Sequence, residues 1–113
     1  MTLAGYVKPK SAAALKQAVA RQPISVGIDA EAKFFHSYAG GIISDPTCGE
    51  TIDHGVLLIG YGHDATLGQD YWLLKNSWGT SWGEGGHFRI LRTDDEGAVG
   101  ICGLQKQSSY PTI

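Results

Sequence analysis

Residues 76–86 read Asn-Ser-Trp-Gly-Thr-Ser-Trp-Gly-Glu-Gly-Gly and hold the only asparagine of the chain, with two tryptophans and four glycines. The triplet Asp53-His54-Gly55 precedes this segment. A histidine that activates a nucleophile needs a third group to fix its ring, and an asparagine oxygen can do this. Glycines allow the backbone to turn closely around large indole rings.

The sequence around these segments predicts strands and one leading helix. Ser11 can cap a helix that ends before Pro23, and alternating apolar side chains predict strands at residues 24–28 and 87–91. This pattern predicts an α+β, mainly β fold, with an antiparallel barrel-like sheet and one N-terminal helix. The remaining segments predict a short helix over 31–37, a strand buried on both faces over 55–61, a loop over 63–69, a strand over 71–75 and a solvated acidic turn over 93–97.

Length and charge narrow the class of protein. The 113 residues are expected to form a single domain, with a core of modest size. The net charge of −2 gives no reason to expect nucleic acid as a partner, and no apolar run approaches the length of a membrane span. Residues 1–4 lack the charged and apolar regions of a signal peptide, so Met1 is interpreted as the start of a fragment.

Several rare residues occur in an order that is typical of one protein family. The matching segments are residues 11–29, Tyr-Ala-Gly-Gly-Ile at 38–42, Asp-His-Gly-Val at 53–56, Gly-Tyr-Gly at 60–62, Tyr-Trp at 71–72, Lys-Asn-Ser-Trp-Gly at 75–79, Gly-His-Phe-Arg-Ile at 86–90, Cys-Gly at 102–103 and Ser-Tyr-Pro at 109–111. On these segments the chain resembles the C-terminal, β-rich domain of papain-like cysteine peptidases. It is more similar to the cathepsin L and plant papain branch than to cathepsin B.

The resemblance implies a role for each site residue. His54 stands where the family has its general base, and Asn76 where it has the residue that orients the base. Trp78 resembles the indole that covers the bond between them, and Trp82 resembles a second indole of the cleft wall. The residues that would supply this domain's side of the substrate pocket are Gly27, Ile52, Gly55 and Gln107.

The nucleophile of that family is missing from these residues. Neither the Gly-Ser-Cys-Trp setting of the catalytic cysteine nor the oxyanion-hole glutamine occurs, and both would come from an N-terminal domain. The chain is therefore expected to be the C-terminal half of a cysteine endopeptidase, inactive alone, with that domain as its partner and a peptide as the substrate of the complete enzyme. The alternatives are a non-catalytic structural or binding module, and an inhibitor-like fragment that pairs with the first domain of another protease. The chain is also expected to self-associate through the bared domain interface.

The two cysteines, Cys48 and Cys102, allow two interpretations from spacing alone: a pair of buried free thiols or one disulfide. The resemblance implies a disulfide, because the family has a bridge at both positions. A disulfide would in turn imply a lysosomal, vacuolar or secreted parent protein. No cofactor is expected and no metal site, since His36, His63 and His87 do not form a ligand spacing with His54.

Overall fold

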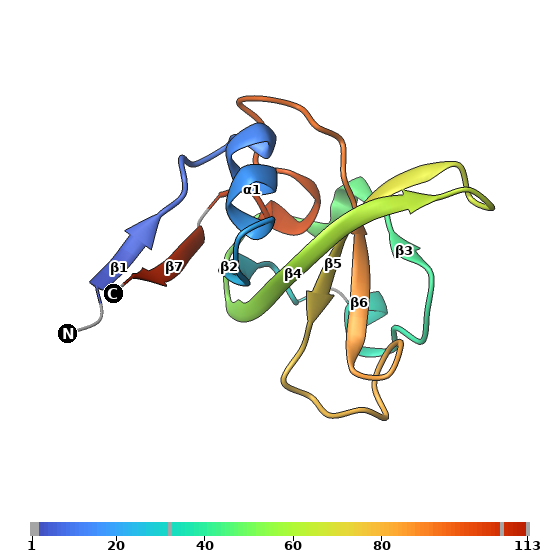
Figure 1. Ribbon diagram of the computed structural model, residues 1–113. Helices are drawn as coiled ribbons and strands as arrows, with labels where there is room; N and C mark the ends of the chain where they lie inside the picture. Colours follow the sequence, from blue (N-terminus) through green and yellow to red (C-terminus); the bar gives the residue numbers. More distant parts are fainter. Residues whose placement is uncertain (1–2, 32, 107, 113) are drawn as a thin grey trace.

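The computed structural model describes residues 3–31, 33–106 and 108–112. Within these residues seven strands form one sheet, with one eight-residue helix packed against it and shorter helical turns around it (Figure 1). The elements are β1 Leu3–Tyr6, α1 Ala12–Val19, β2 Ile24–Ile28, α2 Lys33–His36, β3 Ile42–Ile43, a 3-10 turn at Pro46–Cys48, β4 His54–Asp64, β5 Gln69–Lys75, β6 His87–Leu91, a 3-10 turn at Ile101–Gly103 and β7 Ser108–Thr112. No helix in the described ranges has the length and apolar character that a membrane crossing requires.

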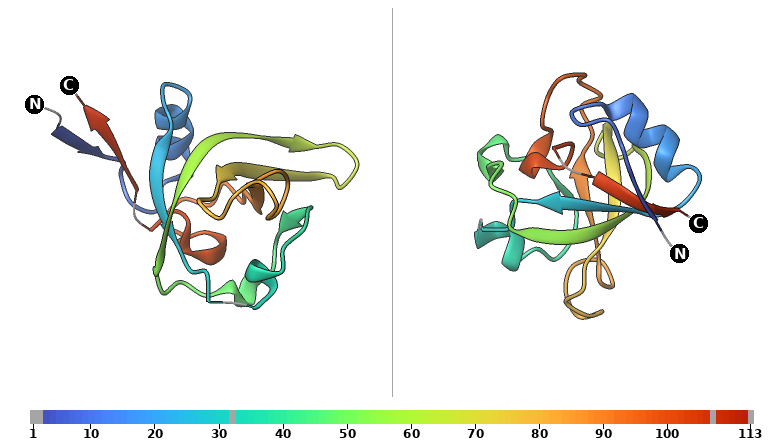
Figure 2. Two further views of the ribbon diagram at one scale, coloured as in Figure 1. Left: turned by 90° about the horizontal axis from the view of Figure 1, so that it is seen from below. Right: turned by 90° about the vertical axis from the view of Figure 1, so that its left-hand side faces the viewer.

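The strands follow the order β1-β7-β2-β4-β5-β6-β3 across the sheet. All pairs are antiparallel except β3 with β6, which is parallel. The predicted α+β, mainly β class is confirmed, but the sheet is mixed and does not close. It is therefore barrel-like only in a loose sense, because β1 and β3 remain its two edges. Both chain ends lie together beside β1 and β7 (Figure 2).

Helix α1 begins where the sequence predicts. The Ser11 hydroxyl accepts a hydrogen bond from Ala14 N–H at 3.1 Å, which satisfies a donor of the first turn. Glu96 caps the same turn from the acidic segment, accepting from the Ser11 hydroxyl at 2.8 Å and from Ala12 N–H at 2.7 Å. Residues 93–97 are exposed, as expected of a solvated turn, but the Glu96 carboxylate also lies against the free N–H groups of α1, which the sequence analysis did not predict.

Strand β4 differs from its prediction in burial and in length. Val56 and Leu58 are buried while Leu57 is only half-buried, so one face of the strand packs on the core and the other is partly open. β4 continues to Asp64 and β5 begins at Gln69, which shortens the predicted loop to residues 65–68. The polar residues of this hairpin extend the ladder because they face solvent, where strands tolerate polar side chains.

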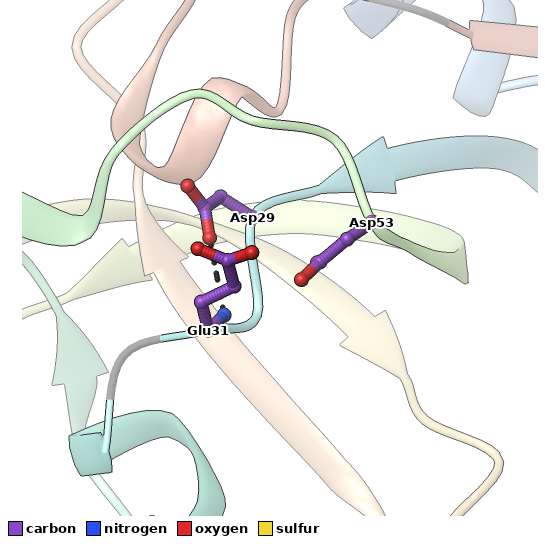
Figure 3. Close-up of side chains that lie close together, drawn as sticks. All are labelled: Asp29, Glu31 and Asp53. Carbon is purple, nitrogen blue, oxygen red and sulfur yellow. Dashed lines mark hydrogen bonds between the residues drawn. The ribbon is translucent and has the colours of Figure 1, made fainter.

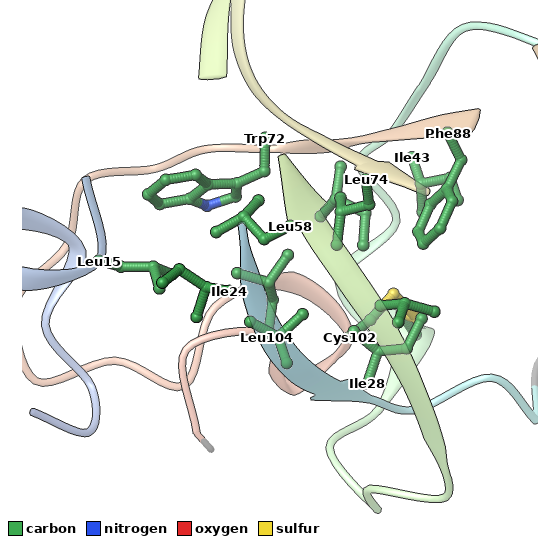
Figure 4. Packing of buried hydrophobic residues seen from close by; sticks show 14 of the residues in the cluster. Leu15, Ile24, Ile28, Ile43, Leu58, Trp72, Leu74, Phe88, Cys102 and Leu104 are labelled. Carbon is green, nitrogen blue, oxygen red and sulfur yellow. A yellow bond between two sulfur atoms is a disulfide. The ribbon is translucent and has the colours of Figure 1, made fainter. Parts of the chain in front are cut away.

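The core lies between β4, β5, β6 and α1. Its fully buried members include Ile90 and several that are labelled in Figure 4: Leu15, Ile24, Ile28, Leu58, Trp72, Leu74, Phe88 and Leu104. Cys48 and Cys102 form a disulfide at the edge of this core, with their Cα atoms 4.8 Å apart, as the resemblance implied. The bridge closes a loop of 54 positions between the two 3-10 turns and fixes them together beside β2.

Candidate active site

His54 and Asn76 meet where β4 begins and β5 has just ended. His54 is the first residue of β4 and is half-buried, and Asn76 follows the last residue of β5 and is 4% exposed. Because β4 and β5 are antiparallel neighbours, the start of one lies beside the end of the other. The two side chains join directly, with His54 Nε2 and Asn76 Oδ1 2.9 Å apart.

The hydrogen bonds of Asn76 fix the direction of this contact. Its Oδ1 also accepts from Ser77 N–H at 2.8 Å, and a backbone N–H can only donate. The atom that faces both groups is therefore the amide oxygen, and Nε2 of His54 must carry the proton. This arrangement leaves Nδ1 as the ring nitrogen that can accept a proton from another group.

Trp78 lies over the histidine, as the resemblance implies. Its indole centroid is 5.1 Å from the His54 ring with the planes tilted by 32°, and the side chain is 37% exposed. Trp82 meets Trp78 edge-on at 5.3 Å and packs against the core. One indole therefore lies against the His54 ring, and the other connects it to the packed interior of the protein.

Two residues of α2 complete an aromatic cluster that the sequence analysis did not assign to the site. Phe35 is fully buried, and its ring contacts those of His36, His54, Trp78, Trp82 and Phe88. His36 is exposed and stacks on Trp78, with centroids 5.0 Å apart and planes 23° apart. The sequence signal was the short helix predicted over residues 31–37. Which rings it meets depends on how α2 packs against residues 76–86, which a local pattern does not contain.

Charged residues hold the loop that carries the tryptophans. Arg89 on β6 donates to Glu84 at 2.9 and 3.0 Å and to Asp64 at 2.8 Å. Glu84 also accepts a hydrogen bond from Gly41 N–H, and the Gly41 carbonyl accepts one from the Tyr38 hydroxyl. The hydrogen bonds that Arg89 donates to Glu84 and Asp64 raise the pKa of Arg89 above its ordinary value, so it stays charged. Burial, followed by the nearby charge of Glu84, raises the pKa of Tyr38 to about 12.

Three carboxylates lie close to the start of β4, within 4.8 Å of one another (Figure 3). The buried Asp29 accepts from Glu31 N–H at 3.1 Å and from Thr51 N–H at 3.0 Å. Asp53 accepts from Ala30 N–H at 2.9 Å. These bonds tie the segment after β2 to the segment before His54, so Asp29 and Asp53 set the position of the strand that carries the base.

The proposed pocket residues are brought together in part. Gly27 on β2 and Gly55 on β4 are paired across the sheet, one residue away from the pairing of Ile28 with His54. A side chain at Gly55 would meet no atom within 4 Å, so the backbone here is open to a ligand. Ile52 is half-buried near Gly103, and Gln107 lies outside the described residues.

A shallow groove of about 420 Å³ runs beside the His54–Asn76 pair. It follows the partly open face of β4 and the end of β5, and it is more apolar than polar. Its lining consists of Ser25, Gly55, Val56, Leu57, Lys75 and Ser77, together with Asn76. The groove therefore combines apolar surface, one exposed cation and the orienting asparagine. Neither cysteine serves this site, because both are buried and bonded to each other.

Comparisons with known proteins agree with this geometry. Residues 1–112 match the family described as papain family cysteine protease. A probable cysteine protease of Arabidopsis thaliana is 45% identical over 114 residues, which is 99% of this chain and 24% of that protein. Cathepsin L of Sarcophaga peregrina is 48% identical over 101 residues, 88% of this chain and 28% of that protein.

Solved structures show the same fold in a longer chain. The bromelain protease of Ananas comosus, solved in complex with the E64 inhibitor, is 40% identical and superimposes with a TM-score of 0.89. The match covers 97% of this chain and 49% of that one. The 113 residues thus span about a quarter of the curated relatives and about half of this solved structure.

Proposed function

Because this chain belongs to the papain family of cysteine proteases, we propose that its 113 residues act as the C-terminal half of a cysteine endopeptidase. In this role His54 is the general base and Asn76 orients it. The observation that carries the proposal is the 2.9 Å contact from His54 Nε2 to Asn76 Oδ1, beneath the indole of Trp78. This contact fixes the tautomer of the His54 base, which lies at the rim of an open groove.

The thiol must come from outside these residues. Cys48 and Cys102 are the only cysteines of the sequence, and their disulfide leaves neither available as a thiolate. This chain covers only 49% of the bromelain structure, so the other half of that structure indicates the size of the part that would supply the thiol. We therefore assign the nucleophile and the oxyanion-hole donors to a second, N-terminal domain.

The groove along β4 and β5 is the surface on which that domain would dock. Its apolar wall reaches Asn76, so a domain seated there would place a cysteine beside His54. Lys75 would face the incoming domain and favour an acidic group on it. In the competing hypothesis, two copies of this chain associate through the same face.

The chemistry assigned to His54 then has four proton transfers, two in each half of the reaction. The cysteine of the second domain gives its proton to Nδ1 of His54, and the resulting thiolate attacks the peptide carbonyl carbon. The imidazolium returns this proton to the leaving amine as the peptide bond breaks, which leaves a thioester. Water attacks the thioester carbonyl carbon while Nδ1 takes a proton from it, the bond between carbon and sulfur breaks, and Nδ1 returns the proton to the leaving thiolate, which releases the acid product and the free thiol. Asn76 accepts from Nε2–H throughout and thereby holds the ring in one orientation.

The disulfide supports a location for the parent protein. Disulfides persist in oxidising compartments and are rare in the cytosol. A buried bridge between Cys48 and Cys102 therefore favours a secreted, lysosomal or vacuolar protein.

Reconstitution tests the proposal. The chain is mixed with a separately produced N-terminal domain of bromelain, and cleavage of a fluorogenic dipeptide amide with an apolar second residue is followed. We expect no cleavage by either part alone, and thiol-dependent cleavage by the mixture. His54→Ala should return the mixture to background, and Asn76→Ala should lower kcat by about two or more orders of magnitude.

His63→Ala is the matched control, since His63 is an exposed histidine on the β4–β5 hairpin that bonds Asp70 instead of the site. It should leave cleavage unchanged. Sedimentation before and after mixing shows whether the two parts bind. A stable complex with no cleavage, or a self-associated chain that excludes the second domain, would contradict the catalytic role and favour a structural or binding module.

A further inference from the structure

The indole of Trp78 is flanked by two histidine rings. Its centroid is 5.1 Å from the His54 imidazole and 5.0 Å from the His36 imidazole. The His36 imidazole is stacked on the indole at 23°, whereas the His54 imidazole is tilted from it by 32°. Phe35 and Trp82 meet it edge-on, at 77° and 80°. His36 therefore supplies the stacked contact among these four rings.

Trp78 needs such support because little else covers it. It is 37% exposed, although it is the ring that shields the His54–Asn76 bond. It belongs to the glycine-containing segment 76–86, where Gly79 and Gly83 have φ angles of 88° and 63°, in the left-handed region. Because the backbone around Trp78 forms tight turns, neighbouring side chains must fix the position of its large ring.

His36 also holds the second indole, by its backbone. Its carbonyl oxygen accepts a hydrogen bond from Trp82 Nε1–H at 3.2 Å. The last residue of α2 thus contacts Trp78 with its side chain and Trp82 with its main chain. A substitution of the His36 side chain removes the first contact and leaves the second in place, so the two functions can be separated.

We propose that His36 is a positioning residue of the active site, whose ring stacks on Trp78 and thereby holds that indole over the His54–Asn76 pair. This role rests on the proposed function, because the base it serves is His54. His36 acts through Trp78, and the effect comes from a flat ring at this position. Any aromatic ring of similar size should therefore replace the imidazole, and a small side chain should not.

The direct test uses the chain alone. NMR chemical shifts of the His54 imidazole protons report the ring current of Trp78, and they are compared among the wild type, His36→Ala and His36→Phe. We expect His36→Ala to move these resonances toward the values seen in Trp78→Leu, and His36→Phe to restore them. His63→Ala, which removes an exposed histidine elsewhere, should leave them in place.

The second readout is the reconstituted enzyme. His36→Ala should lower kcat by roughly 3- to 10-fold with little change in KM, which is the range expected for the loss of one aromatic stack. His36→Phe should recover most of kcat. The substrate is the same dipeptide amide, whose reporter is the leaving group.

The outcomes separate this inference from the proposed function. Unmoved His54 resonances in a folded His36→Ala chain, or a failure of His36→Phe to restore them, overturn the positioning role even if the mixture cleaves substrate. Moved and restored resonances support it even if the mixture is inactive, in which case the proposed function fails instead. If His36→Ala does not fold, the same comparison is made with His36→Ser and His36→Gln.

Discussion

The two ends of β4 are held by different forces. At its first residue, His54 is surrounded by the rings of Phe35 and Trp78 and bonded to a neutral amide. At its last residue, Asp64 is bound by the guanidinium of Arg89. Contacts between rings depend little on salt or pH, whereas ion pairs depend on both. The candidate site thus lies at the end of β4 where packing between rings is added to the hydrogen bonds of Asp29 and Asp53.

The strongest test of this difference is Phe35→Ala. Phe35 is fully buried and touches five other rings, so its loss leaves a cavity beneath both tryptophans and His54. We expect a loss of about 3–5 kcal/mol in the free energy of unfolding. Urea denaturation measures it, and the loss should be the same at low salt and in 1 M NaCl.

Phe35→Leu serves as the control, because it keeps most of the volume and should cost less than about 1.5 kcal/mol. A loss in Phe35→Ala that shrinks with salt, or one no greater than in Phe35→Leu, would mean that the rings do not hold this end of the strand.

A smaller effect is expected at the other end from Arg89→Met. The substitution removes the hydrogen bonds to Glu84 and Asp64 but keeps much of the apolar stem. Because these groups are partly solvated, we expect Tm to fall by roughly 4–8 °C, the shift that corresponds to about 1 kcal/mol in a small domain. Thermal unfolding followed by circular dichroism measures it.

Salt should reduce the difference between Arg89→Met and the wild type, since about 1 M salt shortens the Debye length to about 3 Å. Arg89→Lys keeps the charge but loses the two-pronged contact with Glu84, so its Tm should lie between those of Arg89→Met and the wild type. A Tm difference that salt leaves unchanged would show that packing, and not charge, holds the end of β4.

Acid should weaken the charged end without any mutation. The hydrogen bond from Arg89 lowers the pKa of Asp64 from its ordinary 3.8, and the hydrogen bond from Ser11 lowers that of Glu96 from 4.5. In Glu84, burial is the largest single effect and raises the pKa, but the hydrogen bonds from Arg89 and from Gly41 N–H, with the charge of Arg89, together outweigh it, and the net shift of the pKa is downward. All three groups bind protons more readily in the unfolded chain than in the folded one.

The sign follows from linkage. These carboxylates stabilise the fold fully above their ordinary pKa values, and the contribution is lost as pH falls through the lowered ones. Denaturant midpoints measured from pH 6 downward should therefore decline below about pH 4.5. The decline should be shallower in Arg89→Met. An equal slope in both proteins would indicate that carboxylates outside this network dominate the acid response.

The sequence was most informative where rare residues carry the pattern. The roles of His54 and Asn76 were predicted from the Asp-His-Gly and Asn-Ser-Trp-Gly segments, and the structure brings the two side chains to 2.9 Å. The helix cap at Ser11 and the strand at residues 24–28 follow from local rules and are confirmed. In each case the deciding interaction is close in sequence or belongs to a motif.

What the sequence did not predict depends on distant partners. The capping of α1 by Glu96 joins residues 85 positions apart, and the stacking of His36 on Trp78 joins α2 to a loop that follows three further strands. The apolar run at residues 55–61 correctly predicted a strand, but the predicted burial on both faces was wrong. Periodicity cannot tell which face of a strand another layer covers. The sheet is barrel-like only loosely for the same reason. Whether its edge strands β1 and β3 pair with each other depends on the whole fold, which a local pattern does not contain.

The smallest effect is expected from Tyr61→Leu, within β4 and near its charged end. The guanidinium of Arg92 lies 5.1 Å from the centre of the Tyr61 ring, and that side chain is 45% exposed. A cation over an exposed ring contributes about 0.5–1 kcal/mol, and Arg92 keeps a second ring, that of Trp72, at 5.8 Å. We therefore expect a loss of no more than about 0.5 kcal/mol by urea denaturation, with Tyr61→Phe indistinguishable from the wild type because it retains the ring. The His54 imidazole resonances should not move in either variant, since no described contact links Tyr61 to the aromatic cluster. A loss comparable to that of Phe35→Ala, or a shift at His54, would show that the two ends of β4 form one cooperative unit, and the contrast between a ring-held site and a charge-held hairpin would no longer hold.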